Sequence, residues 1–250
     1  MFAGVSLPGA QRPDENAPKS LEKPAEDAGL YGTLPAGTGI SLDMHHFNIT
    51  GAPILKESWE NLWWETDATI PVHGLNGLDV FQAVGGLSVP VGATTDMHYS
   101  AAPLQDMRVL TLFGHRYAWT TNFSSWVVRA GGGAPEVVYQ SFDWFDEPTY
   151  RYDSVTKNPV PVPGARGDGG SSGLLMLKAG DRIHYNCHIT YTDARASAVM
   201  APRTPAQQGT LGFANLAFSG EMCILFGSTA AVNLAGWGVD GSPLPGFATQ

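Results

Sequence analysis

The most constraining feature of this chain is the segment 181–192, in which polar and apolar residues alternate from Arg182 to Thr192. Side chains on a β-strand point alternately to its two faces, so the pattern predicts a strand with one buried face and one polar face. Cys187 belongs to the apolar set and is therefore expected in the core. The apolar set is Ile183, Tyr185, Cys187, Ile189 and Tyr191, and the polar set is His184, Asn186, His188, Thr190 and Thr192.

The composition extends this prediction to the rest of the chain. Among 250 residues there are 30 Gly and 18 Pro, and only 15% are charged, which favours many short strands joined by turns. No segment has a helical pattern that competes, and the length is ordinary for one β-sandwich. Strands are expected near 41–49, 78–90, 107–119, 123–130, 135–144, 172–178, 181–192, 210–218 and 221–234.

Two segments fall outside the strand pattern. Residues 1–39 are rich in proline and charge and have little apolar periodicity, which predicts an extended arm or linker. Residues 145–171 are rich in Pro, Gly, Asp and Arg, which predicts a long surface loop. The expected organisation is an arm over 1–39 and a single β-sandwich domain over 40–250.

The charge balance limits the classes of partner. A formal net charge of -9 and a pI near 5.1 give no basic surface for nucleic acid or an anionic membrane. No apolar run approaches the roughly 20 residues needed to cross a bilayer, so no membrane span is expected. The start of the chain lacks the features of a signal peptide, and we expect that any leader was removed.

Sequence motifs exclude two common enzyme classes. The chain has no His-Glu-x-x-His motif and no Walker loop. Its two cysteines, taken alone, are compatible with unpaired core thiols or with a bridge.

Three segments carry a resemblance to a known family. They are Gly220–Phe226, which contains Glu221-Met222-Cys223; Met44–Thr50, which fits His-x-x-Asn-x-Thr; and Gly114–Trp119, which contains His115. Over residues 40 to 235 the chain resembles the C-terminal catalytic domain of the copper type II, ascorbate-dependent monooxygenases. This family comprises the peptidylglycine alpha-hydroxylating and dopamine beta-monooxygenases and their bacterial relatives.

The resemblance implies a fold, a metal site and a location. The fold would be an antiparallel jelly-roll β-sandwich of about eight or nine strands. Met222 and His115 would be copper ligands, and Cys187 and Cys223 would form a disulfide. Since disulfides persist in oxidising compartments, the protein would be extracytoplasmic, in a periplasm, on a cell surface or secreted.

One position departs from the family pattern: Tyr117 stands where the family has the second histidine of His-x-His. On a strand, residues 115 and 117 share one face about 7 Å apart, which suits chelation. Three alternatives follow: Tyr117 is a phenolate ligand of a Cu(II)-favouring site, His98 or His73 supplies the missing imidazole, or copper binding has been lost. His184 and His188 lie roughly 13 Å apart on their strand and cannot jointly chelate one ion.

Two main hypotheses of function result. The first is a copper protein that hydroxylates a substrate with O2, taking electrons from ascorbate and requiring a second copper domain or subunit as partner. The second is a non-catalytic jelly-roll subunit for binding or assembly that has lost the copper site, held through the Pro-rich arm and exposed aromatic residues. A copper carrier is a third. No catalytic residue and no site for another cofactor is assigned.

Overall fold

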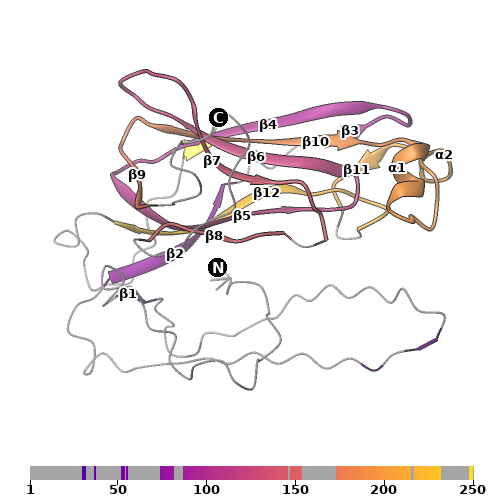
Figure 1. The fold of residues 1–250 in the computed structure, drawn as a ribbon, viewed down its shortest axis with the longest axis horizontal. Helices are drawn as coiled ribbons and strands as arrows, with labels where there is room; N and C mark the ends of the chain where they lie inside the picture. The colour runs from indigo at the N-terminus through magenta and orange to yellow at the C-terminus, as the bar shows by residue number, and fades with distance from the viewer. Residues whose placement is uncertain are drawn as a thin grey trace.

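The computed structural model describes residues 30–31, 37, 52–53, 55, 74–81, 87–145, 147–153, 173–214, 217–231 and 248–249. These residues form an all-β structure in which two sheets pack face to face as a sandwich (Figure 1). The predicted strand at 41–49 and most of the predicted arm over 1–39 lie outside the described residues.

The first layer is a six-stranded sheet. Its strands run in the order β1, β2, β12, β5 and β8, and β9 also pairs with β5. All pairs are antiparallel except β1 with β2, which is parallel. The bounds are β1 Leu30–Tyr31, β2 Gly74–Phe81, β12 Cys223–Ala231, β5 Met107–Arg116, β8 Tyr150–Arg151 and β9 Leu175–Leu177.

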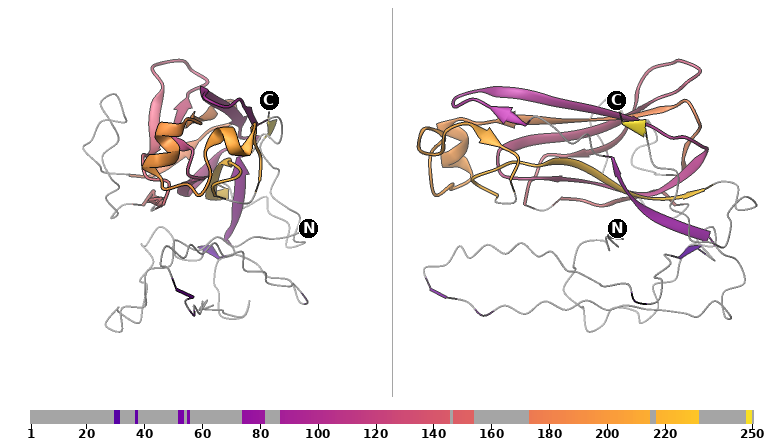
Figure 2. Two further views of the ribbon diagram at one scale, coloured as in Figure 1. Left: turned by 90° about the vertical axis from the view of Figure 1, so that its right-hand side faces the viewer. Right: turned by 180° about the vertical axis from the view of Figure 1, so that it is seen from behind.

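The second layer is a five-stranded antiparallel sheet in the order β13, β4, β10, β6 and β7. A further two-stranded pair, β3 with β11, and two short helices lie at one end of the sandwich, which faces the viewer in the left panel of Figure 2. The bounds are β13 Ala248–Thr249, β4 Thr94–Ala102, β10 Arg182–Thr190, β6 Thr120–Val128, β7 Glu136–Ser141, β3 Ser88–Val89, β11 Leu211–Gly212, α1 Asp193–Ala198 and α2 Pro205–Gln208.

The core lies between the two layers, and β10 shows why. Its odd-numbered residues from Ile183 to Ile189 are buried, and its even-numbered residues are half-exposed, as the alternation predicts. They meet the inward residues of the other sheet, among them Leu112 and Leu225. A disulfide joins Cys187 of β10 to Cys223 of β12 across the core, with a Cα–Cα distance of 6.0 Å, which confirms the predicted bridge.

Most of the strand predictions are confirmed in place, and the described residues form thirteen strands where about eight or nine were expected. Eight of the described strands have three or more residues and five have two. The segments expected at 107–119, 135–144, 172–178, 181–192 and 221–234 each contain a strand of three or more residues, and the segment 123–130 overlaps β6, which begins three residues earlier. The segment 78–90 holds the end of β2 and all of β3, and 210–218 contains only the two-residue β11.

Six elements were not predicted: β4, the two helices, and the two-residue strands β1, β8 and β13, of which β1 lies in the predicted arm and β8 in the predicted surface loop over 145–171. Strand β4 has few strongly apolar residues, and its inward positions Met97, Tyr99 and Ala101 alternate with polar ones. The two helices have six and four residues, too few to show a helical period in the sequence. Both begin at threonines: the Thr192 hydroxyl accepts the Arg195 N–H at 3.2 Å, and Thr204 forms a capping box ahead of Pro205.

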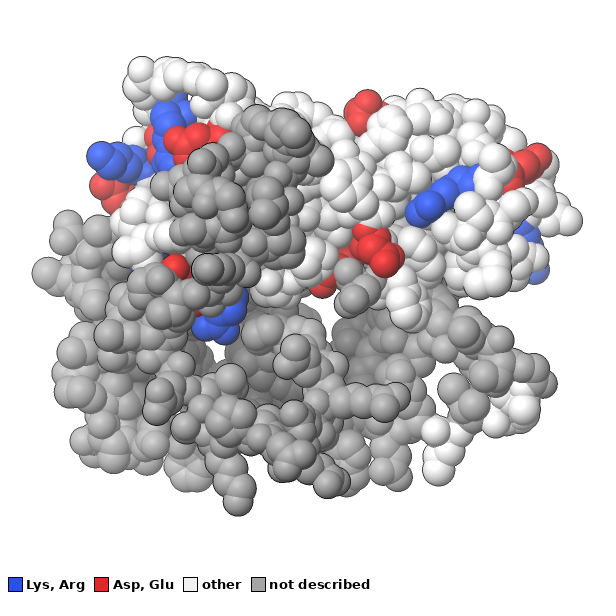
Figure 3. Space-filling model, in the orientation of Figure 1, with Lys and Arg blue, Asp and Glu red and all other residues white. Residues whose placement is uncertain are grey.

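Two features of the surface bear on partners. Neither helix in the described part of the chain has the length and apolar character needed to cross a membrane. On the face drawn in Figure 3, charged side chains of both signs are scattered among uncharged ones.

Candidate functional site

The pairing of β5 with β12 places the predicted ligands. His115 lies opposite Ile224, and Arg116 lies opposite Cys223. Residues directly opposite each other in an antiparallel pair point to the same face. Since Cys223 points into the core to reach Cys187, His115 and Ile224 point to the other face of the six-stranded sheet, here called its outer face.

Met222 comes directly before β12, and extending the register by one residue places it opposite Tyr117. It then lies on the outer face and diagonal to His115. Diagonal neighbours in an antiparallel pair are about 7 to 8 Å apart at Cα, within reach of a side chain as long as methionine. Met222 and His115 are both half-buried. The fold therefore brings a thioether and an imidazole, distant in sequence, to one place.

Tyr117 belongs to the same group of side chains. Its ring lies edge-on to the His115 ring, with centroids 5.3 Å apart and an interplanar angle of 76°. The Tyr117 residue is buried, and His115 also contacts the Phe226 ring at 6.1 Å. The structure thus brings together His115, Tyr117 and the position of Met222.

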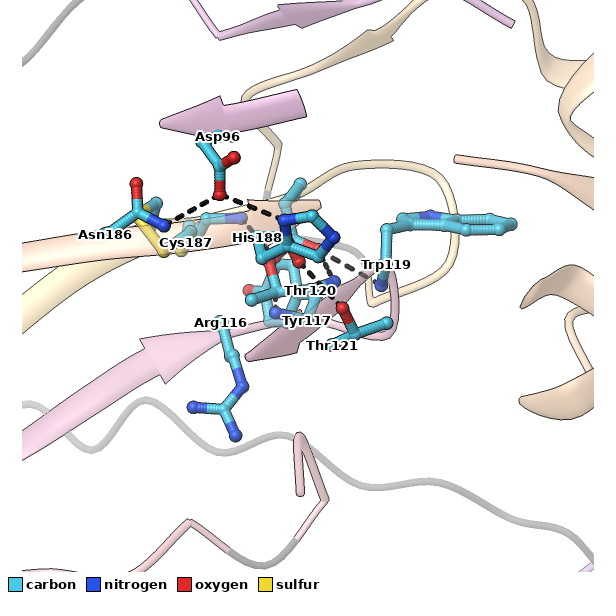
Figure 4. Close-up of a disulfide and its surroundings, with 12 residues drawn as sticks. Asp96, Arg116, Tyr117, Trp119, Thr120, Thr121, Asn186, Cys187 and His188 are labelled. Atoms are coloured by element: carbon cyan, nitrogen blue, oxygen red, sulfur yellow. Dashed lines mark hydrogen bonds and ion pairs between the residues drawn. A yellow bond between two sulfur atoms is a disulfide. The ribbon is translucent and has the colours of Figure 1, made fainter. Parts of the chain in front are cut away.

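A buried carboxylate, Glu221, shapes the turn that carries Tyr117. Its two carboxylate oxygens accept the backbone N–H groups of Tyr117 and Trp119, in the connection between β5 and β6, of Thr120, the first residue of β6, and of Met222. The Trp119 and Thr120 bonds measure 3.1 and 2.9 Å. Burial raises the pKa of Glu221 to about 7, against these N–H donors, which lower it. Figure 4 shows the turn beside the disulfide.

The turn is also held from helix α1. The guanidinium of Arg195 donates to the Ala118 carbonyl at 2.8 Å, and the Trp119 indole donates to the Phe218 carbonyl at 3.1 Å. The Trp119 carbonyl accepts the N–H of Thr190 at 2.8 Å. The chain on the carboxyl side of His115 is therefore fixed by three neighbouring segments.

Arg116 points inward, away from the outer face, and anchors the interior below the site. Its guanidinium donates to Ser141 Oγ at 2.7 Å and to the Asp143 carbonyl, and lies 3.8 Å from Glu147. Glu147 also accepts the Arg116 backbone N–H at 3.0 Å. Burial raises the pKa of Glu147 to about 8 although the charge of Arg116 opposes the shift.

The donor set fits copper through two ligands. Among the described residues no three His, Cys, Asp or Glu side chains lie close enough to hold a metal ion together. An imidazole with a thioether is a pair that soft Cu(I) accepts, and it falls outside such a group because it has only two donors, one of which is a methionine. The phenol of Tyr117 would bind only as phenolate, which a Cu(I) ion does not enforce.

The other histidines lie elsewhere. His98, considered as a third ligand, is on β4 in the five-stranded sheet, where its side chain is exposed beside His184. It lies on the opposite side of the sandwich from His115, and the structure does not bring these two residues together. His45, His46 and His73 lie outside the described residues.

Sequence reasoning missed the roles of Glu221, Glu147 and Arg116. In the sequence, Glu221 is only part of the Glu-Met-Cys motif. No local pattern connects it with the turn after His115, about a hundred residues earlier.

Comparisons of the chain with models of known protein families and with curated proteins find no match, so the likeness to the copper monooxygenases is carried by the motifs alone.

Proposed function

We propose that this protein is a copper-binding β-sandwich, similar to the catalytic domain of the ascorbate-dependent monooxygenases, in which His115 and Met222 hold one copper ion. The observation that supports the proposal is the register of β5 and β12, which pairs His115 with Ile224; continued by one residue past Cys223, it would set Met222 diagonal to His115 on the outer face. A bound copper ion would supply the chemistry with dioxygen that the family performs.

The chain's own residues have distinct tasks in this proposal. The His115 imidazole and the Met222 thioether bind the ion, and Tyr117 packs against the imidazole and limits its rotation. Cys223, next to Met222, ties the ligand strand to the opposite sheet, and Glu221 ties it to the turn that follows His115. This arrangement would keep the donors in place when no ion is bound.

Location and partners belong to the proposal as well. The disulfide supports an extracytoplasmic location, since such bridges persist where the environment is oxidising. Hydroxylation would need a second copper domain or subunit and ascorbate as the electron donor. Without them the same site would serve as a copper carrier.

The test is a Cu(I) titration of the whole chain against a chromophoric chelator, in wild type and in Met222→Leu and His115→Gln. We expect one tightly bound Cu(I) ion in wild type and at least about tenfold weaker binding in each variant, equivalent to about 1.4 kcal/mol. Met176→Leu, at a half-exposed methionine on β9, is the matched control and should bind as wild type. Equal affinity in Met222→Leu and wild type would reject the site.

One observation favours the second candidate, a binding or assembly subunit. Phe142 and Phe145, which follow β7, are 58% and 69% exposed. Trp144 between them contacts Phe145 and Phe218 edge-on. Exposed aromatic groups of this kind are frequent where proteins bind one another. A chain that binds no Cu(I), with no ascorbate-dependent oxygen uptake, would favour this candidate.

A further inference from the structure

The outer face of the five-stranded sheet carries a second group of histidines, independent of the proposed copper site. Three neighbouring strands, β4, β10 and β6, present polar residues there. In the register, Asn186 lies opposite His98, and His184 lies opposite Ser100 on one side and Trp126 on the other. His98 and His184 are therefore diagonal neighbours across β4 and β10.

The two imidazoles face each other edge to edge. His98 Nε2 lies 3.1 Å from His184 Nδ1, the ring centroids are 5.2 Å apart, and the interplanar angle is 9°. The centroid separation exceeds the distance between the nitrogens by about one ring width, so the nitrogens point toward each other. One ring must donate an N–H and the other must accept it, because two N–H groups would repel at this distance.

This spacing matches that of two ligands on one metal ion. Metal–imidazole bonds of about 2.0–2.1 Å place two nitrogens on neighbouring coordination positions about 2.9–3.4 Å apart. Rotation of both rings away from the line that joins the two nitrogens would direct both lone pairs to a common point. Two rings held at ligand spacing by a rigid pair of strands need little further ordering to bind an ion.

We propose that His98 and His184 form a surface site for a divalent transition-metal ion, with Cu2+ preferred over Ni2+ and Zn2+. The ion binds His98 Nε2 and His184 Nδ1, and water fills the remaining positions. In a neutral pair, the proton of the hydrogen bond moves to the other nitrogen of the donor ring, so both ligands stay neutral and no proton is lost.

The surrounding charges are compatible with this role. Burial lowers the pKa of His184, and the charges of His98 and Arg182 lower it further, which favours the neutral form that binds metals. Asp96, two residues from His98 on the same face, supplies a negative charge. Its carboxylate already binds Asn186 at 2.8 Å and His188 at 2.9 Å, as Figure 4 shows, so His188 is held away from the pair.

The site includes its own reporter. The Trp126 ring lies nearly parallel to both imidazoles, with centroids 5.3 Å from His98 and 5.5 Å from His184. A paramagnetic Cu2+ ion bound by the two histidines would quench the fluorescence of so close an indole. Trp126→Phe identifies how much of the quenching belongs to this ring.

The experiment titrates the whole chain with Cu2+, Ni2+ and Zn2+ separately, above pH 7, with fluorescence and Cu2+ spin resonance as readouts. We expect one Cu2+ ion with two nitrogen ligands, quenching of Trp126, and at least tenfold weaker binding in His98→Ala and in His184→Gln. His188→Ala and Met222→Leu should bind as wild type, the latter because the proposed copper site lies on the opposite face.

The contrary results are equally definite. Unchanged Cu2+ affinity in His98→Ala, whose exposed side chain can be removed without disturbing the core, would overturn the proposal. So would equal losses in His98→Ala and His188→Ala, since they would indicate binding to histidines in general. Loss of Cu(I) binding in Met222→Leu with Cu2+ quenching retained would keep the two sites separate.

Discussion

At the scale of single residues, the side chain that shapes the proposed copper site is Glu221, which is not itself a ligand. Its carboxylate accepts four backbone N–H groups, three of them from the turn after His115. A backbone donor that is buried needs a partner, and the Glu221 carboxylate is the acceptor for the N–H groups of Tyr117 and Trp119. The carboxylate therefore determines where Tyr117 lies.

We expect Glu221→Ala to be strongly destabilising. The variant leaves the N–H groups of Tyr117 and Trp119 without their carboxylate acceptor, and each buried donor left unpaired costs about 1–3 kcal/mol. The Thr120 N–H keeps the Tyr117 carbonyl as a second acceptor. The loss should exceed about 3 kcal/mol in urea unfolding. Glu221→Gln keeps one acceptor oxygen and should lose less; equal losses in the two variants would contradict this role.

Tyr117→His should bind Cu(I) more tightly. The Tyr117 ring already contacts His115, so an imidazole at this position would lie near the ion as a third donor. We expect a gain of about tenfold or more, measured in the chelator titration. Tyr117→Phe, which removes only the hydroxyl, should leave the affinity unchanged. No gain in the histidine variant would mean that the outer face does not direct its donors to one point.

Glu147 should make stability depend on pH. Folding raises its pKa from 4.5 to about 8, so between these values the native state holds a proton that the unfolded chain has lost. The free energy of unfolding therefore falls as pH rises through this window, by at most about 1.4 kcal/mol per pH unit for one group.

In Glu147→Gln the decrease between pH 7 and 8.5 should become shallower, as measured by urea unfolding at several pH values. Glu136→Gln is the control: that carboxylate is 30% exposed in its ion pair with Arg129, and it should leave the slope unchanged. An identical slope in wild type and Glu147→Gln would contradict the raised pKa.

At the scale of elements, the sequence predicts strands whose apolar alternation is strong and fails where it is weak. The segment 181–192 correctly predicts β10 and its buried face, because every second residue from Ile183 onward is apolar. The sequence does not predict strand β4, because its inward residues Met97 and Ala101 are not typical strand formers. Its outward residues Asp96, His98 and Ser100 are polar, so the segment as a whole is weakly apolar. Since β4 was not predicted, its register with β10 was not known, and the contact between the His98 and His184 imidazoles could not be predicted.

The same limit applies to the proposed copper site. His115, Tyr117 and Met222 were found from motifs, and their meeting on one face follows from a single register between β5 and β12. The contacts of Glu221 and Arg116 with distant turns depend on tertiary packing, which leaves no periodic trace in the sequence. Sequence motifs thus identify candidate ligands, but they do not identify the residues that hold those ligands in place.

At the scale of the whole molecule, the Cys187–Cys223 bridge is the covalent link between the two sheets. It closes a segment of 36 residues, and on the chain-entropy model it contributes about 3–4 kcal/mol by restricting the unfolded chain. We expect a marked fall in the melting temperature in reductant. The Cys187→Ser/Cys223→Ser double variant should melt at the lower temperature with or without reductant, and an unchanged melting temperature in the reduced wild type would contradict this contribution.

The three residues of the Glu-Met-Cys triplet have different roles. Glu221 and Cys223 serve the scaffold, one through the turn and the other through the bridge, whereas Met222 contributes to neither with its side chain. Substitution of Met222 would therefore abolish the proposed metal binding and leave the fold intact. In related chains, Glu-x-Cys would mark descent of the scaffold, and the residue between them would report whether the chemistry survived.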